Sequence, residues 1–135
     1  MNFTVADGGG GGGGGSGSVP SSPPSTPTLV SPINTTVTSS PTYTWNAVAG
    51  ATDYCLAVAD STGYRILQWF TAADAGCTTG TGTCSLTPAT LLSAGANRWG
   101  VQARNSLGSG PWSTIVDFTV YTEVGSGSVT IIANP

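Results

Sequence analysis

Between Thr28 and Tyr121 the chain alternates short apolar–polar runs with clusters of turn-forming residues. In the run Thr42–Asn46, the period of two places Tyr43 and Trp45 on one face, as in a half-buried strand. Many short strands separated by turn signals are typical of a two-sheet sandwich. We therefore predict an all-β, seven-stranded antiparallel β-sandwich with extended N- and C-terminal tails. Its strands are expected at 28–31, 42–46, 53–59, 64–70, 84–87, 98–104 and 112–120.

The composition agrees with a β-structured fold and restricts the kinds of partner. Glycine, serine, threonine and proline are abundant, whereas leucine and glutamate are scarce, so long helices are not expected. Only 7% of the 135 residues are charged, and the chain has three arginines but neither lysine nor histidine. It lacks the basic surface that nucleic acid requires. No apolar run approaches the ~18 residues of a membrane-spanning helix. We expect no nucleic-acid partner and no membrane span.

The three cysteines have different expected roles. Cys77 and Cys84 close a loop of glycine and threonine, and nothing in it has the ligands or spacing of a zinc site. We predict a Cys77–Cys84 disulfide. Since disulfides persist in oxidising compartments, the expected location is extracellular or at the cell surface. Cys55 is left over, and we favour a small buried apolar side chain over the alternative of an intermolecular cross-link.

The two ends of the chain resemble each other. Asn2–Val5 contains the Phe-Thr-Val sequence that recurs in Asp117–Val120, and both copies are followed by Gly-Ser-Gly-Ser-Val. We interpret the first copy as the last strand of a preceding unit, or as a duplicate of this unit's own last strand. On this interpretation the signal peptide for secretion lies upstream of this chain.

These patterns divide the chain into three parts. Residues 1–27 are predicted to be a strand remnant followed by a linker, in which eight consecutive glycines (8–15) precede a stiffer proline-rich stretch. Residues 28–121 are the predicted β-sandwich. Residues 122–135 are predicted to be a Gly/Ser linker and a short apolar strand.

Several motifs in a fixed order identify the kind of sandwich. They are Trp45, Tyr54-x-Leu56-x-Val58, Leu86-Thr87-Pro88, Val101-Gln102-Ala103-Arg104-Asn105-x-x-Gly108 and Gly110-Pro111-Trp112-Ser113. Together they resemble a fibronectin type III repeat, an immunoglobulin-like β-sandwich, of the kind found in secreted bacterial surface proteins. The resemblance covers about residues 28–121 and implies a non-catalytic module.

Some positions depart from the family pattern. Asn97 stands where the family usually has a corner tyrosine, so the packing and hydrogen bond of that tyrosine must be replaced. Cys55, Ala57 and Gly100 stand where bacterial relatives often carry bulky aromatics, which predicts a small, flat outer face without a stacking platform. The core is expected to contain Trp45, Trp99 and Trp112.

No constellation in the sequence indicates catalysis. A nucleophile needs a neighbouring base, usually histidine or lysine, and this chain has neither. The six acidic residues are dispersed, so a carboxylate pair for glycoside cleavage is not expected. Asp60 could join a loosely bound calcium ion, but we favour a simple turn role, because the EF-hand ligand pattern is absent. We predict no catalytic residue, no cofactor and no metal site.

The favoured function is a non-enzymatic extracellular structural or adhesive module, a subunit or repeat unit of a filament. Its partners would be other copies of itself or neighbouring repeats, linked by β-strand addition through the terminal segments. Ala57 and Gly100 would allow a neighbouring chain to approach closely. The candidate strands between subunits contain Asn2, Phe3, Thr4, Val5, Val129, Ile131 and Ile132.

The alternative function is an accessory carbohydrate-binding module attached to a secreted enzyme, with polysaccharide as its partner. On the predicted strand 64–70, Trp69 shares a face with Arg65 and Leu67 near a sheet edge. This hypothesis predicts that Trp69, Tyr64 and Arg65 are exposed together and contact a sugar.

Overall fold

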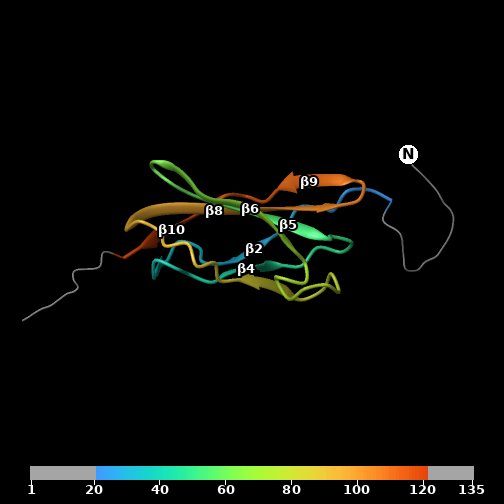
Figure 1. Ribbon diagram of the computed structural model, residues 1–135, viewed down its shortest axis with the longest axis horizontal. Coiled ribbons are helices and arrows are strands. Elements are labelled where there is room, and N and C mark those ends of the chain that lie inside the picture. Colours follow the sequence, from blue (N-terminus) through green and yellow to red (C-terminus); the bar gives the residue numbers. More distant parts are fainter. Residues whose placement is uncertain (1–20, 122–135) are drawn as a thin grey trace, which may run out of the picture.

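The computed structural model describes residues 21–121, which form two β-sheets packed face to face (Figure 1). The predicted all-β sandwich is confirmed, but the predicted number of seven strands is wrong. Within the described range there is no helix that could cross a membrane. Nine strands occur there: β2 (Leu29–Ser31), β3 (Thr36–Val37), β4 (Tyr43–Asn46), β5 (Asp53–Asp60), β6 (Gly63–Thr71), β7 (Thr83–Leu86), β8 (Gly95–Asn105), β9 (Gly108–Trp112) and β10 (Val116–Val120).

The larger sheet has the order β3-β10-β8-β5-β6, with β9 also paired to β8, and the smaller sheet has the order β2-β4-β7. Neighbours are antiparallel except β3 and β10, which are parallel. The sequence missed β3 because two residues cannot show a periodic pattern. It also merged β9 and β10 into one strand. Ser113 separates them: its N–H donates to the carbonyl of Val101 (2.9 Å), and its hydroxyl accepts from the N–H of Val101 (3.0 Å).

Aromatic side chains from both sheets form the core. Trp45 of the smaller sheet and Trp99 of the larger sheet are 0% and 1% exposed, as predicted. The Tyr43 ring lies 5.1 Å from the Trp99 ring, and the Tyr54 ring lies 5.4 Å from the Trp45 ring. Tilted contacts of this kind add to the stabilisation from burial alone. The indole N–H of Trp99 donates to the carbonyl of Pro32 at 2.8 Å, so this buried donor is satisfied.

Trp112 is not in the core, so the prediction for this residue is wrong. Its side chain is 40% exposed. In a continuous strand, Trp112 and the buried Phe118 would share one face, because they are six positions apart and side chains alternate with a period of two. The break at Ser113 changes that parity. Trp112 instead pairs with Gln102, which lies between the buried residues Val101 and Ala103 and therefore faces away from the core.

Asn97 compensates for the missing corner tyrosine. It is only 3% exposed, and its amide group donates to the carbonyls of Ser93 (3.2 Å) and Gly95 (3.1 Å). A corner tyrosine would bond to backbone a few residues upstream in a similar way. Asn97 therefore ties the start of β8 to the preceding turn.

The segment that precedes β2 lies along β9. The side-chain amide of Asn105 donates to the carbonyl of Ser22 at 2.9 Å, and Pro24 is buried. The Pro24 carbonyl lies so close to Gly110 that a side chain at position 110 would overlap it. Residues 22–25, here called the N-terminal strap, are therefore packed against the sheet.

The described chain enters and leaves at opposite ends of the sandwich (Figure 1). The strap is bound by Asn105, the last residue of β8. At the other end, Val120 pairs with Gly95, the first residue of β8, and the N–H of Tyr121 donates to Val37. The eleven residues of β8 separate these two points by about 33 Å, from the usual rise of a strand.

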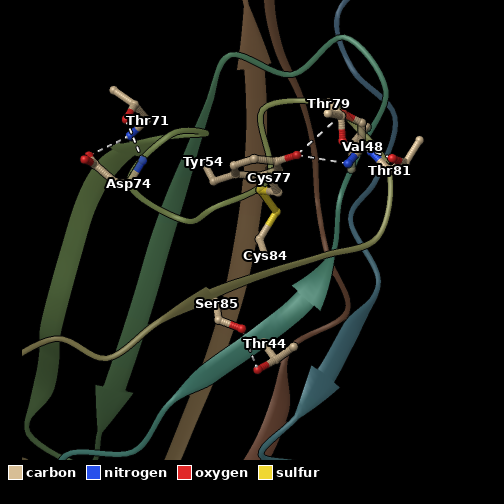
Figure 2. The surroundings of a disulfide bond; sticks show 10 residues. All are labelled: Thr44, Val48, Tyr54, Thr71, Asp74, Cys77, Thr79, Thr81, Cys84 and Ser85. Carbon is tan, nitrogen blue, oxygen red and sulfur yellow. Dashed lines mark hydrogen bonds between the residues drawn. A yellow bond between two sulfur atoms is a disulfide. The ribbon is translucent and has the colours of Figure 1, made fainter.

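The predicted Cys77–Cys84 disulfide is confirmed (Figure 2). It closes part of the connection that carries the chain from β6 in the larger sheet to β7 in the smaller sheet. Both sulfur atoms belong to the buried core. Beside the disulfide, the hydroxyl of Tyr54 accepts a hydrogen bond from the N–H of Val48 at 2.9 Å, which fixes the loop between β4 and β5. Burial raises the pKa of Tyr54.

Candidate functional site

The larger sheet has an inner face toward the core and an outer face away from it. On β5, Tyr54, Leu56 and Val58 are fully buried in the core, as their alternation predicts. Cys55 and Ala57 point the other way, yet they are only 4% and 8% exposed. Side chains from the flanking strands must therefore cover part of this outer face.

Strand β6 is a free edge of the larger sheet. It pairs with β5 on one side, and no other strand among the described residues pairs with it. Tyr64 is 68% exposed and Leu67 57% exposed. Most long sheet edges are protected by charges or proline, whereas the nine residues of β6 include one charge, Arg65, and no proline. The backbone of β6 is therefore open to pairing with another strand.

The predicted contact residues of β6 have different environments. Tyr64 and Arg65 are exposed, but Trp69 is half-buried. The guanidinium carbon of Arg104 lies 4.0 Å from the centre of the Trp69 ring, in a cation–π contact. The Nε of Arg104 also donates to the carboxylate of Asp53 at 2.9 Å, which holds the guanidinium over the ring. One face of Trp69 is therefore covered within the molecule.

Ile115 covers the outer face at Gly100. The end of the Ile115 side chain occupies the space that a Cβ at position 100 would need, and Ser113 also lies beside it. Gly100 and the neighbouring Ala57 are buried. The small residues therefore make room for Ile115, and this part of the face is not the open, flat surface that the sequence predicted.

Large and small side chains together shape a surface groove of about 710 Å³ on this outer face. Its floor is formed by Ala57 and Ala59 of β5. Tyr64 of β6 lines one side, and Trp112 and Ile115 line the other. The remaining lining residues, at the end formed by the β5–β6 turn, are Asp60, Ser61, Thr62, Gly63 and Arg98.

Asp60 shapes the turn at the end of this groove. Its Oδ1 accepts hydrogen bonds from the backbone N–H and the hydroxyl of Thr62, at 2.8 and 2.6 Å. These bonds hold the pKa of Asp60 below its ordinary value. Arg65 lies 3.7 Å from the other carboxylate oxygen. Among residues 21–121, no group of three or more histidine, cysteine, aspartate or glutamate residues could hold a metal ion.

Cys55 is a free cysteine on the outer face, and it is buried. Burial raises the pKa of its thiol, so less of the reactive thiolate is present near neutral pH. These observations agree with the favoured apolar role. They do not favour a cross-link, which would need the sulfur atom to be accessible to another chain.

The predicted strands between subunits lie outside the described residues, and so does the polyglycine run. The residues concerned are Asn2, Phe3, Thr4, Val5, Val129, Ile131 and Ile132. Of the features that strand addition would need, the described residues include a free edge strand, β6.

Two sheets with this strand order, antiparallel apart from the pair β3–β10, a shared aromatic core and the paired strands β8 and β10 define a fibronectin type III-like fold. No protein-family model matches the chain, and no curated protein matches it. The class is thus defined by structure.

Several solved structures are similar to this chain. One is the chitinase ChiW from Paenibacillus sp. str. FPU-7, at 16% identity and a TM-score of 0.50, covering 78% of this chain and 9% of the chitinase. FN3tt matches at 15% identity and a TM-score of 0.47, covering 74% of this chain and 97% of FN3tt. The FN1–FN3 domains of chicken CNTN1 match at 18% identity and a TM-score of 0.43, covering 75% of this chain and 35% of that one. The chain therefore corresponds to a small part of the much longer chitinase.

Arg98, Trp112 and Ile115 are among the groove residues that sequence reasoning missed. Arg98 belonged to a predicted strand, but no pattern indicated a groove beside it. The positions of Trp112 and Ile115 depend on the break at Ser113, which the sequence signals only weakly. The sequence did single out Tyr64 and Ala57, although it assigned them to two different hypotheses.

Proposed function

We propose that this chain is a non-catalytic, extracellular structural or adhesive module that joins other copies of itself, or neighbouring repeats, by β-strand addition. The observation that carries this proposal is the free edge β6, nine residues long with a single charge. In strand addition, an extended segment pairs its backbone with such an edge, and pockets for alternate side chains give specificity. Tyr64 and Leu67, both exposed on β6, would contact the added strand.

The donor strands in this proposal are Asn2–Val5 and Val129–Ile132, which are rich in residues with high strand propensity. The described chain enters and leaves at opposite ends of the sandwich, which supports a linear, head-to-tail arrangement. The Cys77–Cys84 disulfide supports an oxidising, extracellular location. The similar part of ChiW belongs to a bacterial cell-surface-expressed, multi-modular enzyme, which also supports the role of a module.

Deletion of the donor segments tests the proposal. We expect assembly to be lost in three variants, as measured by sedimentation velocity and negative-stain imaging. They are a chain without residues 1–7, a chain without residues 129–132, and the double deletion. The disulfide and the circular dichroism spectrum should be unchanged, because the deletions remove none of the residues 21–121 that form the two sheets. Unchanged assembly of the double deletion would refute strand addition through the terminal segments.

A substitution on the acceptor edge tests the other half of the interface. Leu67→Lys places a charge on the exposed edge of β6, which should block pairing with another strand without loss of the fold. Leu91→Lys is the matched control, because Leu91 is 66% exposed and lies outside every strand. Equal assembly of both variants would show that β6 is not the acceptor.

A further inference from the structure

We propose that the groove between Tyr64 and Trp112 binds an extended, neutral polysaccharide of pyranose units. The site lies on the outer face of the larger sheet beside the free edge of β6, with which it shares Tyr64. It also contains Trp112 and Arg98, which the sequence did not assign to any site and which lie away from that edge. It extends from the level of Trp112, paired with Gln102, to the turn at Asp60, paired with Asn97. Five residues along β8 correspond to about 16 Å, from the rise of a strand.

The aromatic walls provide the apolar part of the site. Tyr64 is 68% exposed and Trp112 is 40% exposed, and both line the groove. Each ring combines a large apolar surface with a polar group at its edge. A pyranose ring has apolar faces formed by C–H groups, with hydroxyl groups at its rim, so it matches such a wall. Between the walls, Ala57 and Ala59 are small enough to leave room for a sugar ring.

The polar groups of the groove favour a neutral ligand. Arg98 carries up to five N–H donors, and no ion pair involves it among residues 21–121. The hydroxyl of Ser61 is exposed at the same end. Charges of both signs balance at this end, because Asp60 is paired with Arg65, and Arg98 lies opposite Asp117 on the neighbouring strand β10. The groove therefore offers hydrogen bonds to hydroxyl groups without the net charge that an anionic ligand would need.

The backbone below the groove argues against a peptide ligand. A peptide that adds to a sheet needs unpaired backbone groups along an edge. The floor of the groove lies on β5, which pairs with β6 on one side and with β8 on the other. The backbone of β5 is therefore already paired. A ligand on this floor would contact side chains rather than unpaired backbone groups. The open groove along the strand suits an extended sugar chain.

Titration of the full-length chain with cellohexaose and with chitohexaose tests the proposal. We expect at least one of them to bind, with quenching or a shift of tryptophan fluorescence and a matching heat in calorimetry. Trp112→Ala and Tyr64→Ala should each weaken binding by about tenfold or more, since each removes a stacking surface. Tyr121→Ala is the control, because Tyr121 is 44% exposed and does not line the groove.

Three outcomes overturn the proposal. The first is that neither oligosaccharide binds, and the second is that Trp112→Ala binds as tightly as the natural chain. The third is that Trp112→Ala loses assembly but keeps sugar binding. The last result would place a segment of a neighbouring chain in the groove. Ala59→Phe provides a second variant that fills the groove while both walls remain, and it should also weaken binding. Leu67→Lys should still bind the sugar, so failure of strand addition and failure of sugar binding are distinguishable.

Discussion

The carbonyl of Pro24 lies against Gly110, in the space that a methyl group at position 110 would require. We predict that Gly110→Ala releases the N-terminal strap, because a backbone carbonyl cannot move aside as a flexible side chain can. With the Asn105–Ser22 hydrogen bond lost, the free energy of unfolding should fall by about 1–2 kcal/mol. Hydrogen exchange should become faster in residues 22–27.

Gly100→Ala is the matched control for this prediction. Its new methyl group would meet the end of the Ile115 side chain, which can rotate away, and would lie 3.2 Å from the hydroxyl oxygen of Ser113. We expect a smaller change in the free energy of unfolding and no change in hydrogen exchange of the strap. Equal protection of the strap in both variants would contradict the proposed role of Gly110.

The disulfide should contribute measurably to stability. Cys77→Ser with Cys84→Ser should lower the free energy of unfolding by about 2.5 kcal/mol, since the unfolded chain regains the freedom of the loop that the bond closes. Urea unfolding with and without a reductant measures this difference. The reductant should destabilise the natural chain and leave the double variant unchanged. If the reductant also destabilised the double variant, its effect on the natural chain would not come from the Cys77–Cys84 disulfide.

Stability should decline at alkaline pH, beginning with Cys55. Burial raises the pKa values of Cys55, Tyr43 and Tyr54. A raised pKa means that the folded state keeps the proton, so the associated stability is complete below the unfolded pKa and is lost as pH rises toward the folded value. The loss should begin near pH ~8.5 from the cysteine and steepen above about 10 from the tyrosines. Urea unfolding across this range measures it.

Cys55→Ala should remove the first part of the alkaline decline and leave the tyrosine part. In the natural chain, a thiol reagent at neutral pH should label Cys55 only after unfolding, because the side chain is buried. Rapid labelling of the folded protein would contradict the burial of this thiol.

Asp60 should report on the turn between β5 and β6. Thr62 lowers the pKa of Asp60 by donating two hydrogen bonds to its carboxylate. The stability from these bonds is present above the unfolded pKa of about 4 and is lost as pH falls through the lower folded value. Thr62→Ala removes the hydroxyl donor and should raise the pKa of Asp60 in an NMR titration. Thr79→Ala, in an exposed loop, should leave it unchanged.

The alternation of residues predicted the inner face of the sandwich well. Tyr54, Leu56 and Val58 lie in the core because a strand places every second side chain on one face. The disulfide was also predictable, because two cysteines enclose a short loop of glycine and threonine. Neither prediction needed knowledge of distant contacts.

The groove could not be predicted, because it depends on how the chain deviates from regular alternation. Ser113 pairs with Val101 through both its backbone and its hydroxyl, and this break changes the direction of Trp112. The same break carries Ile115 over Gly100. A sequence pattern with a period of two describes regular strands and says nothing about the place where the period changes.

The attachment of both ends of the described segment, 21–121, to β8 has a mechanical consequence. Tension applied between Ser22 and Tyr121 acts nearly parallel to the strands, because Ser22 is bound at one end of β8 and Val120, the residue before Tyr121, is paired at the other end. The parallel pair β3–β10 and the antiparallel pair β10–β8 then carry the load in shear. Their hydrogen bonds lie across the pulling direction and must break together, which gives the module resistance to stretching along the axis on which copies would be joined.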